Sequence, residues 1–438
     1  MPKPSMLLIL PRFPYPPIGG DKLKSFHLIQ ILSKSFELKL VCIAQNPLDK
    51  QTLAFCKQHF THYEIFQKSK FNHFCSMLKA LFSPLPLQVQ YYYFNDVARS
   101  VKTLAKECDI VLNTLVRTAP YVESLQDKIR ILDIVDSIFL NYNRSRKSSP
   151  SLLFRLYYTL EAKRLQKYEY QCVKHYNLTL FVNHLEAHYY KNFGNVLCIP
   201  NGVDSALLAP REKLPQYRHC IAFCGKMDYR PNIDAMQWFV SSVMPKLHPN
   251  ITLLIIGTNP TKAVLKLQNK RIQVTGYLND VHTPISSCFA TIAPMQTGGG
   301  IQNKILEAMA LEQIVITTTL GAKPILHAQD TTHLLVCDSA DSMANTINAI
   351  YTTPQNYAHI GKNARELIAT HYSWEQSGML LTQALLGLTS NGGGAELESS
   401  SLYLVYYLYW VKNTKPSPSF TISFTSIINL NLGGYNAA

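Results

Sequence analysis

The feature that constrains this chain most is a triple glycine between an apolar run and a helical pattern. The run from Ala290 to Pro294 predicts a buried strand, and the residues after Gly298–Gly300 follow the period of a helix. On that helix Lys304 and Glu307 are three positions apart and therefore share one face. A strand, a glycine loop and a helix in this order favour an α/β fold.

The same residue types favour a binding site for a nucleoside diphosphate. Glycines let the backbone approach a ligand closely, and the first turn of a helix offers unpaired N–H groups to an anion. Lys304 adds a positive charge, and Glu307 can accept two hydrogen bonds from the neighbouring hydroxyls of a ribose. The spacing alone leaves an alternative open, a glycine-rich turn before an ordinary helix with a surface Lys and Glu.

Strand and helix patterns alternate through both halves of the chain, which predicts two parallel sheets with right-handed crossovers. In the first half strands are expected at 6–10, 38–44, 109–113, 129–135 and 178–182, and in the second at 220–225, 251–257, 271–276, 289–294 and 313–319. The Gly19–Gly20 loop after the first strand is typical of mononucleotide-binding sheets. Phe66–Phe94 is aromatic, contains two prolines, and is expected to be an irregular insertion.

Composition indicates a globular protein with two domains, because the chain has 438 residues, of which 47% are hydrophobic and 16% charged. The start resembles no signal peptide, and no run reaches the ~18 apolar residues of a membrane span. Ten cysteines without CxxC spacing indicate neither a zinc site nor a disulfide framework. We therefore expect free thiols and a cytoplasmic location.

The formal charge of +14 calls for a negatively charged partner. Residues 144–175 contain eight Lys and Arg against two Glu, interleaved with Leu, Phe and Tyr. This mixture predicts contact with a membrane surface, peripheral to the inner membrane, and no nucleic-acid motif accompanies it. The alternative is a core-facing helix with a solvated basic back.

Four stretches of the second half resemble the retaining GT-B glycosyltransferases of family four. They are Gly225–Asn232, Leu253–Gly257, Val274–Tyr277 and Gly298–Ala310. The resemblance covers roughly residues 6–386 and is strongest from 196 to 319. It is closest to bacterial enzymes that build exopolysaccharide or other surface glycans.

The resemblance implies an α/β fold with two Rossmann-like domains whose parallel sheets face a central cleft. The expected division is an N-terminal acceptor domain at 1–198, a linker at 199–205 and a nucleotide-sugar-binding domain at 206–370. A C-terminal helix at 371–388 is expected to cross back to the first domain. The remainder, 389–438, is expected to be a disordered or aberrant tail.

The resemblance also implies site residues. Glu307 matches the glutamate that binds the donor ribose, Lys304 matches part of the diphosphate clamp, and Lys226 matches a basic residue near the phosphates. The implied donor-binding residues are Gly20, Gly298, Gly299, Gly300, Arg230 and Ile301. Two departures stand out: Gly299 replaces the first glutamate of many relatives, and Asn232 replaces their second basic residue. Arg230 or Lys304 is expected to supply the missing charge.

Asp133 and Asp136 end a first-half strand, where the sheet faces its ligand crevice. We favour Asp136 as a fourth catalytic candidate beside Glu307, Lys304 and Lys226, because it lies beyond the apolar part of the strand. It is expected to orient hydroxyls of donor or acceptor. The alternative is a helix-capping or turn aspartate.

The resemblance implies a transferase of class EC 2.4 that moves a sugar from a nucleoside diphosphate to a hydroxyl, with retention, on a glycan or lipid-linked acceptor. Lysines and a helix N-terminus can stabilise the leaving diphosphate, and the metal-binding Asp-x-Asp motif is lacking, so no metal or cofactor is expected. Two alternatives stay open: a sugar-nucleotide epimerase, and a non-catalytic binding subunit of a glycan-assembly complex.

Overall fold

The computed structural model describes residues 3–17, 19–45, 47–148 and 151–390. Most of the expected tail, from 391 on, lies outside these residues. No helix within the described ranges is long and apolar enough to span a membrane.

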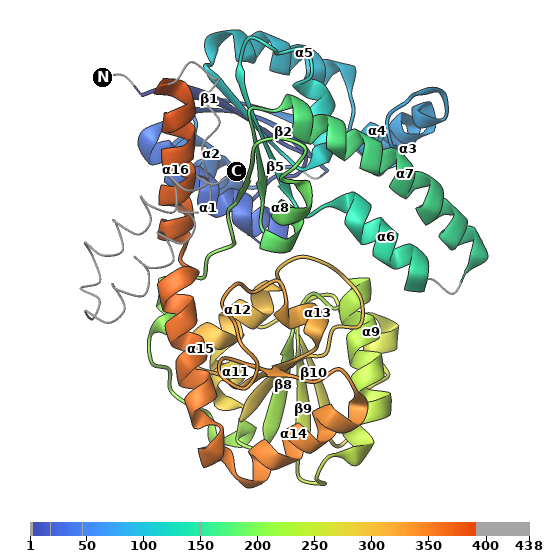
Figure 1. Cartoon of the computed structure of the whole chain (residues 1–438), viewed down its shortest axis with the longest axis vertical. Helices are drawn as coiled ribbons and strands as arrows, with labels where there is room; N and C mark the ends of the chain where they lie inside the picture. The colour runs from blue at the N-terminus through green and yellow to red at the C-terminus, as the bar shows by residue number, and fades with distance from the viewer. Residues whose placement is uncertain (1–2, 18, 46, 149–150, 391–438) are drawn as a thin grey trace, which may run out of the picture. The chain divides into compact units, whose positions relative to one another are not determined.

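Two sheets of parallel strands, one in each half of the chain, form the framework (Figure 1). The first sheet has the order β3-β2-β1-β4-β5-β6-β7 and the second the order β10-β9-β8-β11-β12-β13. The strands of the first sheet are β1 (Ser5–Leu10), β2 (Glu37–Ala44), β3 (His62–Gln67), β4 (Ile110–Thr114), β5 (Ile129–Val135), β6 (Leu178–Phe181) and β7 (Val196–Cys198). Those of the second are β8 (Cys220–Cys224), β9 (Thr252–Ile256), β10 (Ile272–Gly276), β11 (Ala290–Ala293), β12 (Val315–Thr317) and β13 (Leu335–Val336).

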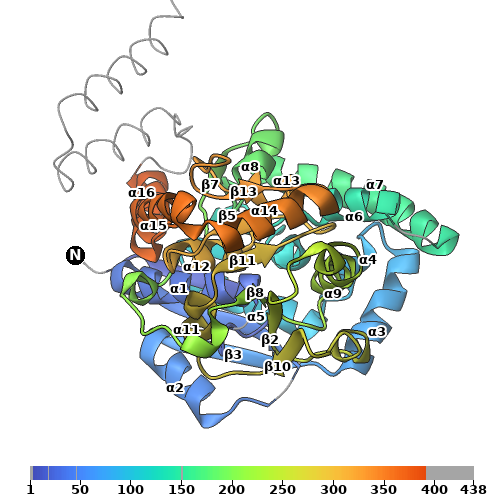
Figure 2. The same cartoon turned by 90° about the horizontal axis from the view of Figure 1, so that it is seen from below.

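Helices lie on both sides of each sheet, as Figures 1 and 2 show. In the first half they are α1 (Gly20–Ser35), α2 (Lys50–His59), α3 (Lys70–Leu78), α4 (Leu87–Gln90), α5 (Asn95–Leu104), α6 (Ile138–Ser148), α7 (Leu152–His175) and α8 (His184–Tyr190). In the second they are α9 (Arg230–Trp238), α10 (Lys262–Leu265), α11 (His282–Ser287), α12 (Asn303–Ala310), α13 (Thr319–Ala322), α14 (Ala340–Thr352), α15 (Ala358–His371) and α16 (Trp374–Ser390). Short helical turns connect several of them, among them η1 (Lys79–Phe82).

The central strands are apolar along their whole length because helices cover both faces of a parallel sheet. Every residue from Met6 to Leu10 is buried, and so is every residue from Leu253 to Ile256. The two sheets therefore have separate hydrophobic cores. The α/β class with two parallel sheets is confirmed, and each predicted strand is present within two residues of its expected bounds.

The expectation that the segment Phe66–Phe94 is irregular is wrong. The segment contains the end of β3 and the helices α3, η1 and α4. Ser69 caps α3, with reciprocal hydrogen bonds to Asn72, and the buried His73 ring stacks on Tyr91 at 4.5 Å between centroids. The aromatic residues obscured a helical period that the structure makes plain.

The chain passes between the two sheets twice, and the two crossings are hydrogen-bonded to each other. Val203 N donates to Tyr372 O at 2.7 Å, and Val203 and Ser373 form a parallel bridge. Trp374, the first residue of α16, stacks on His27 of α1 with 4.2 Å between ring centroids. The domain boundaries given above stay a prediction.

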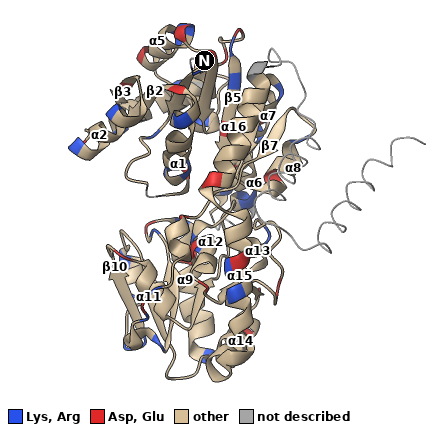
Figure 3. Cartoon of the chain, turned by 90° about the vertical axis from the view of Figure 1, so that its left-hand side faces the viewer, with Lys and Arg blue, Asp and Glu red and all other residues tan. Residues whose placement is uncertain are grey.

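Charges of both signs are mixed on the side of the molecule shown in Figure 3. The helix α15, for example, carries Lys362 and Arg365 next to Glu366. The net positive charge is therefore not spread as one even layer.

Candidate functional site

The order of strands reverses between β1 and β4 in the first sheet and between β8 and β11 in the second. Ligands of such sheets bind beyond the carboxyl ends of the strands at this reversal. The segments that leave β8 and β11 there are Gly225–Lys226 and the loop Gly298–Gly300. The predicted donor residues of the second half are thus gathered around one reversal point.

Lys304 lies half-buried at this point with neutral partners. Its Nζ donates to Asn232 Oδ1 at 2.5 Å, lies 3.8 Å from Met295 Sδ and lies over the Phe223 ring at 4.5 Å from the centroid. No ion pair joins Lys304 to an acidic group of the described residues. Burial lowers the pKa of Lys304 to about 8, because the charged form loses hydration that the nearby Glu307 carboxylate only partly offsets.

Asn232, at the position where the resemblance implies a basic residue, holds Lys304 in place. Its Nδ2 donates to Lys226 O at 2.9 Å while its Oδ1 accepts from Lys304. A Cβ on Gly225 would lie 2.7 Å from Asn232 Nδ2 and 3.3 Å from Lys304 Nζ. Only a glycine therefore leaves room for this arrangement.

The other two predicted basic residues are more exposed. Lys226 Nζ lies 3.4 Å from Asp228 Oδ2, and half of its side chain is accessible. Arg230 pairs with Asp234 one turn along α9 at 2.8 Å, with 78% of its side chain exposed. Of the two replacements considered for the missing base, Lys304 is the one that contacts Asn232.

Glu307 lies one turn after Lys304 on α12 and is about a third exposed. Its Oε2 is 3.8 Å from Nε2 of His282. The carboxylate therefore keeps capacity to accept hydrogen bonds from a ligand.

The glycine loop is shaped by positive φ angles and by close contact with the first half. Gly298 and Gly300 have φ of 110° and 73°, values that side chains rarely adopt. A Cβ on Gly300 would lie 2.1 Å from Asp136 Oδ1, and one on Gly299 would lie 2.1 Å from both Asn141 Oδ1 and Arg144 Nη1. A glutamate at position 299 would therefore have to displace the Asn141 and Arg144 side chains of α6.

Ile301, which follows the loop, packs on three apolar residues of the first half: Leu115, Val135 and Val182. Arg144 Nη1 lies 3.5 Å from Gly298 O. The backbone of this loop is thus fixed by apolar contact on one side and by an arginine on the other.

Asp136 lies directly after a strained residue. Val135 has φ of 65°, and Leu115, which follows β4, has φ of 59°. Such conformations are costly for residues with a Cβ, above all for β-branched ones, and they cluster at functional sites. Asp136 Oδ1 is buried and has no hydrogen-bond partner in the described protein. Burial raises the pKa of Asp136 to about 6, against the opposing charges of Lys24 and Arg144.

Asp133, the neighbouring candidate, has a structural partner. Its Oδ1 pairs with Lys24 Nζ at 2.6 Å, and both side chains are fully buried. This buried ion pair ties α1 to β5. The preference for Asp136 over Asp133 stays a prediction, and the geometry favours it.

The sequence did not indicate the residues around Asp136. Glu186 Oε2 accepts from Ser137 N at 2.7 Å, and its Oε1 is 3.3 Å from Arg144 Nη2. Burial, together with the charge of Asp136, raises the pKa of Glu186 to about 8. Lys24 and Glu186 are buried although they lie on helices, where charged residues usually face solvent, so their spacing gave no signal of burial.

Gly20 begins α1, after Gly19 with φ of 106°. No atom lies within 4 Å of where a Cβ on Gly20 would stand. The space there is open, and the predicted contact of Gly20 with a diphosphate stays a prediction. Among the described residues, no group of three or more His, Cys, Asp or Glu side chains is placed to hold a metal ion.

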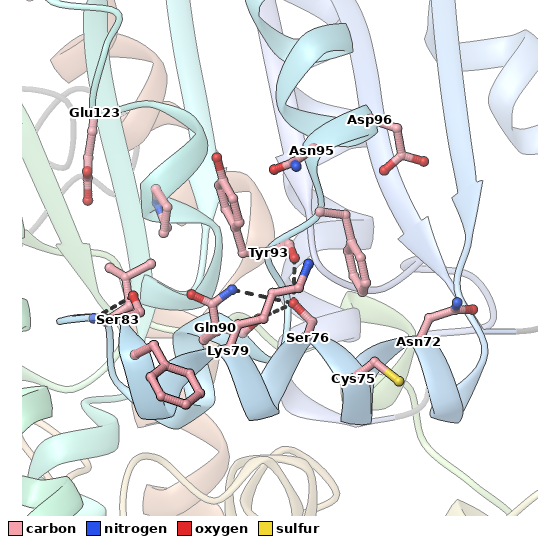
Figure 4. A pocket seen from close by; sticks show the side chains of 14 residues that line it. Asn72, Cys75, Ser76, Lys79, Ser83, Gln90, Tyr93, Asn95, Asp96 and Glu123 are labelled. Atoms are coloured by element: carbon pink, nitrogen blue, oxygen red, sulfur yellow. Dashed lines mark hydrogen bonds between the residues drawn. The ribbon is translucent and has the colours of Figure 1, made fainter.

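A separate cavity of about 810 Å³ lies within the first half (Figure 4). It is lined from below by α3 and η1, through residues such as Cys75, Ser76 and Lys79, and from the opposite side by Tyr93 and Asn95. None of the predicted site residues lines it. We keep the strand reversal as the candidate site, because Lys304 with its lowered pKa lies there and the strained Val135 precedes Asp136, which lies beside Gly300.

Comparisons with known proteins address the family and the fold. Residues 218–353 match the family described as Glycosyl transferases group 1. A search among curated protein sequences gives no match.

Solved structures of similar fold cover nearly the whole chain. Sucrose-phosphate synthase of Thermosynechococcus elongatus has a TM-score of 0.65 at 15% identity, covering 88% of this chain and all of that one. HepE of Anabaena, in complex with UDP-glucose, has a TM-score of 0.62 at 15% identity, covering 87% and 100%. WaaG, a glycosyltransferase involved in lipopolysaccharide biosynthesis, has a TM-score of 0.59 at 15% identity, covering 85% and 98%. The chain therefore has the GT-B fold, and the family match over its second sheet supports a glycosyltransferase of group 1.

Proposed function

We propose that the protein transfers a sugar from a nucleoside-diphosphate sugar to a hydroxyl of a glycan or lipid-linked acceptor, with retention at the anomeric carbon. The observation that carries this proposal is the Lys304 ammonium, half-buried at the strand reversal and held by a neutral amide. A half-buried cation without a salt-bridge partner has lost hydration that an anionic ligand can replace. A diphosphate beside Gly298–Gly300 would supply it.

The chemistry asks mainly for stabilisation of the leaving group. The bond between the anomeric carbon and the phosphate oxygen breaks, and the acceptor oxygen bonds to that carbon. The departing diphosphate takes the negative charge and can take the acceptor proton. Lys304, Lys226 and the N-terminus of α12 would stabilise that charge by preorganised electrostatics, and we propose that no metal is required.

Glu307 and Asp136 would place the two ends of the donor. Glu307 has a carboxylate with free accepting capacity on the same helix as Lys304, which suits the paired hydroxyls of a ribose. Asp136 has a buried oxygen without a partner beside Gly300. We propose that this oxygen accepts a hydrogen bond from a hydroxyl of the transferred sugar or the acceptor.

We further propose a role in the synthesis of exopolysaccharide or another surface glycan, on the cytoplasmic side of the membrane. Two points support it. The motifs of the second half resemble those of such enzymes, and WaaG, whose fold is similar, is involved in lipopolysaccharide biosynthesis.

The first test is thermal stabilisation of the full chain by UDP, GDP and ADP, with the Glu307→Ala and Lys304→Met variants alongside. UDP is the first choice because HepE was solved with UDP-glucose. We expect a shift with one diphosphate that each variant reduces. Glu366→Ala, on exposed α15, is the matched control and should keep the shift.

Turnover of the matching nucleotide sugar then separates the alternatives. Release of the diphosphate together with an acceptor product of unchanged anomeric configuration by NMR supports the proposal. An isomerised donor without release would indicate an epimerase. Binding without any turnover would indicate a non-catalytic subunit.

A further inference from the structure

The helix α7 divides into two parts with different surroundings. Its second part packs on the first sheet through residues that include Leu165, Cys172 and Val173. Its first part is exposed: Leu152, Leu153, Phe154, Leu156 and Leu160 have between 57% and 81% of their surface accessible. The alternative of a core-facing helix thus holds for the second part of the basic segment alone.

A second exposed apolar stripe lies on α3 and η1. Phe71, Phe74, Leu78 and Phe82 recur at three- and four-residue intervals, so they share one side of the helical path. Phe82 is 95% exposed and Phe71 72%. Large apolar side chains at this exposure and spacing mark an interaction surface more often than chance exposure.

Arg164 joins the two stripes. It stands one turn beyond Leu160 on α7, and its Nη2 donates to Ala80 O at 3.2 Å and to Ser83 O at 2.8 Å, on both sides of Phe82. Figures 1 and 2 both place α3, α4 and α7 on the same side of the molecule. We call this combined area, made of the exposed residues of 70–82 and 152–167, the α3–α7 face.

The exposed charges of the α3–α7 face are all positive. Residues 70–82 contain Lys70 and Lys79 and no acidic residue. In 152–167 the single acidic residue is Glu161, which is 2% exposed and accepts from Gln88 N, whereas Arg155, Lys163 and Lys167 are exposed. Burial raises the pKa of Glu161.

We propose that the α3–α7 face binds an anionic lipid bilayer, with its Leu and Phe side chains in the interface and its Lys and Arg side chains on lipid phosphates. Apolar residues together with cations, and no exposed carboxylate among the described residues of the face, fit an acidic membrane surface better than a protein of mixed charge. This proposal rests on the proposed function in one respect only: a membrane surface would present the lipid-linked acceptor.

Vesicle co-sedimentation of the full chain tests this without donor or acceptor. We expect binding to phosphatidylcholine vesicles that contain phosphatidylglycerol, weak binding to phosphatidylcholine alone, and a loss of binding at high salt. Phe82→Ser and Leu153→Ser should each weaken binding about tenfold, as expected for one large apolar side chain. Leu265→Ser, an exposed leucine of α10, is the matched control.

Charge is tested separately with Lys79→Glu and Lys163→Glu, against Lys270→Glu as the control on the second half. Equal binding to both kinds of vesicle, or unchanged binding in the apolar variants, would overturn the proposal. A concentration-dependent dimer that Phe82→Ser dissociates would assign the face to a second copy of the chain. Diphosphate binding, measured by thermal shift in the same variants, should stay unchanged, so a failure here is distinct from a failure of the proposed function.

Discussion

At the scale of single residues, the candidate site combines groups whose ionisation is held away from its ordinary range. Lys304 has a lowered pKa, whereas Asp136 and Glu186 have raised ones, and burial is the largest cause in all three. Buried groups of this kind respond to pH near neutrality. Lys304 and Asp136 therefore each give a prediction with a definite sign.

Diphosphate binding should weaken as the pH rises above about 8, because Lys304 then loses the charge that the ligand neutralises. Without ligand the sign is opposite. The unfolded chain binds the Lys304 proton more tightly between about 8 and the ordinary lysine pKa of 10.5, so this group adds stability as the pH rises through that window. Lys304→Met should remove the pH dependence of binding and weaken it by about 2–4 kcal/mol. Calorimetric titrations with UDP at several pH values check this, and an unchanged pH profile in Lys304→Met would contradict it.

Turnover should fall as the pH drops through about 6, because a protonated Asp136 no longer accepts freely from a substrate hydroxyl. The raised pKa also means that the folded chain binds this proton more tightly, so the apo protein gains stability as the pH falls from about 6 toward 3.8. Asp136→Asn should lower kcat/KM about 100-fold and abolish the fall in turnover on the acidic side of the pH profile. Asp127→Asn, on the exposed surface, is the control. An acidic limb that survives in Asp136→Asn would assign it to another group.

At the scale of elements, the loop from β11 to α12 depends on the absence of side chains at its glycines, because atoms of the first half occupy the space that those side chains would need. Gly300 combines a φ of 73° with a neighbouring carboxylate that occupies the place of a side chain. The loop is therefore fitted to α6 and to the residues after β5, and its composition follows from that fit. The motif could be recognised locally, whereas the reason for Gly299 required the structure.

Gly300→Ala should destabilise the fold and lower turnover, and Gly276→Ala separates the two causes. Gly276 has nearly the same φ of 70° but no atom within 4 Å of its Cβ position, so its substitution measures backbone strain alone, about 1–2 kcal/mol. The additional cost in Gly300→Ala reports the collision with Asp136. Adding Asp136→Ala to Gly300→Ala should recover that additional part in urea unfolding. Strict additivity of the two substitutions would show that the groups do not touch.

Strands could be predicted from the sequence where their own residues form a clear apolar pattern. Strands such as β1 and β9 are apolar throughout and were expected, whereas β3 alternates with polar residues at the sheet edge and β13 has only two residues, and both were missed. Lys304 and Glu307 were found because their spacing lies within one helix. Lys24 was not, because its burial depends on Asp133, 109 positions away.

At the scale of the whole chain, the two crossings between the sheets depend on Gly202. A Cβ at this position would lie 2.3 Å from Trp374 N, and the nearby atoms are backbone that cannot rotate away. Gly202→Ala should therefore lower the free energy of unfolding by about 1–3 kcal/mol. Gly20→Ala, in open space, should change stability much less. Equal unfolding midpoints for the two variants would show that the two connecting segments can move apart at little cost in stability.

The paired crossings have a consequence for motion. The two connecting segments pair with each other, Val203 with Tyr372 and Ser373, so the two halves are joined by a pair of strands and not by one flexible segment. We expect this pairing to limit the relative motion of the two halves to rotation about one axis. We expect each closure of the two halves to bring the Gly300 backbone back to the Asp136 carboxylate. The paired connection would then keep the two halves of the site in register from one catalytic cycle to the next.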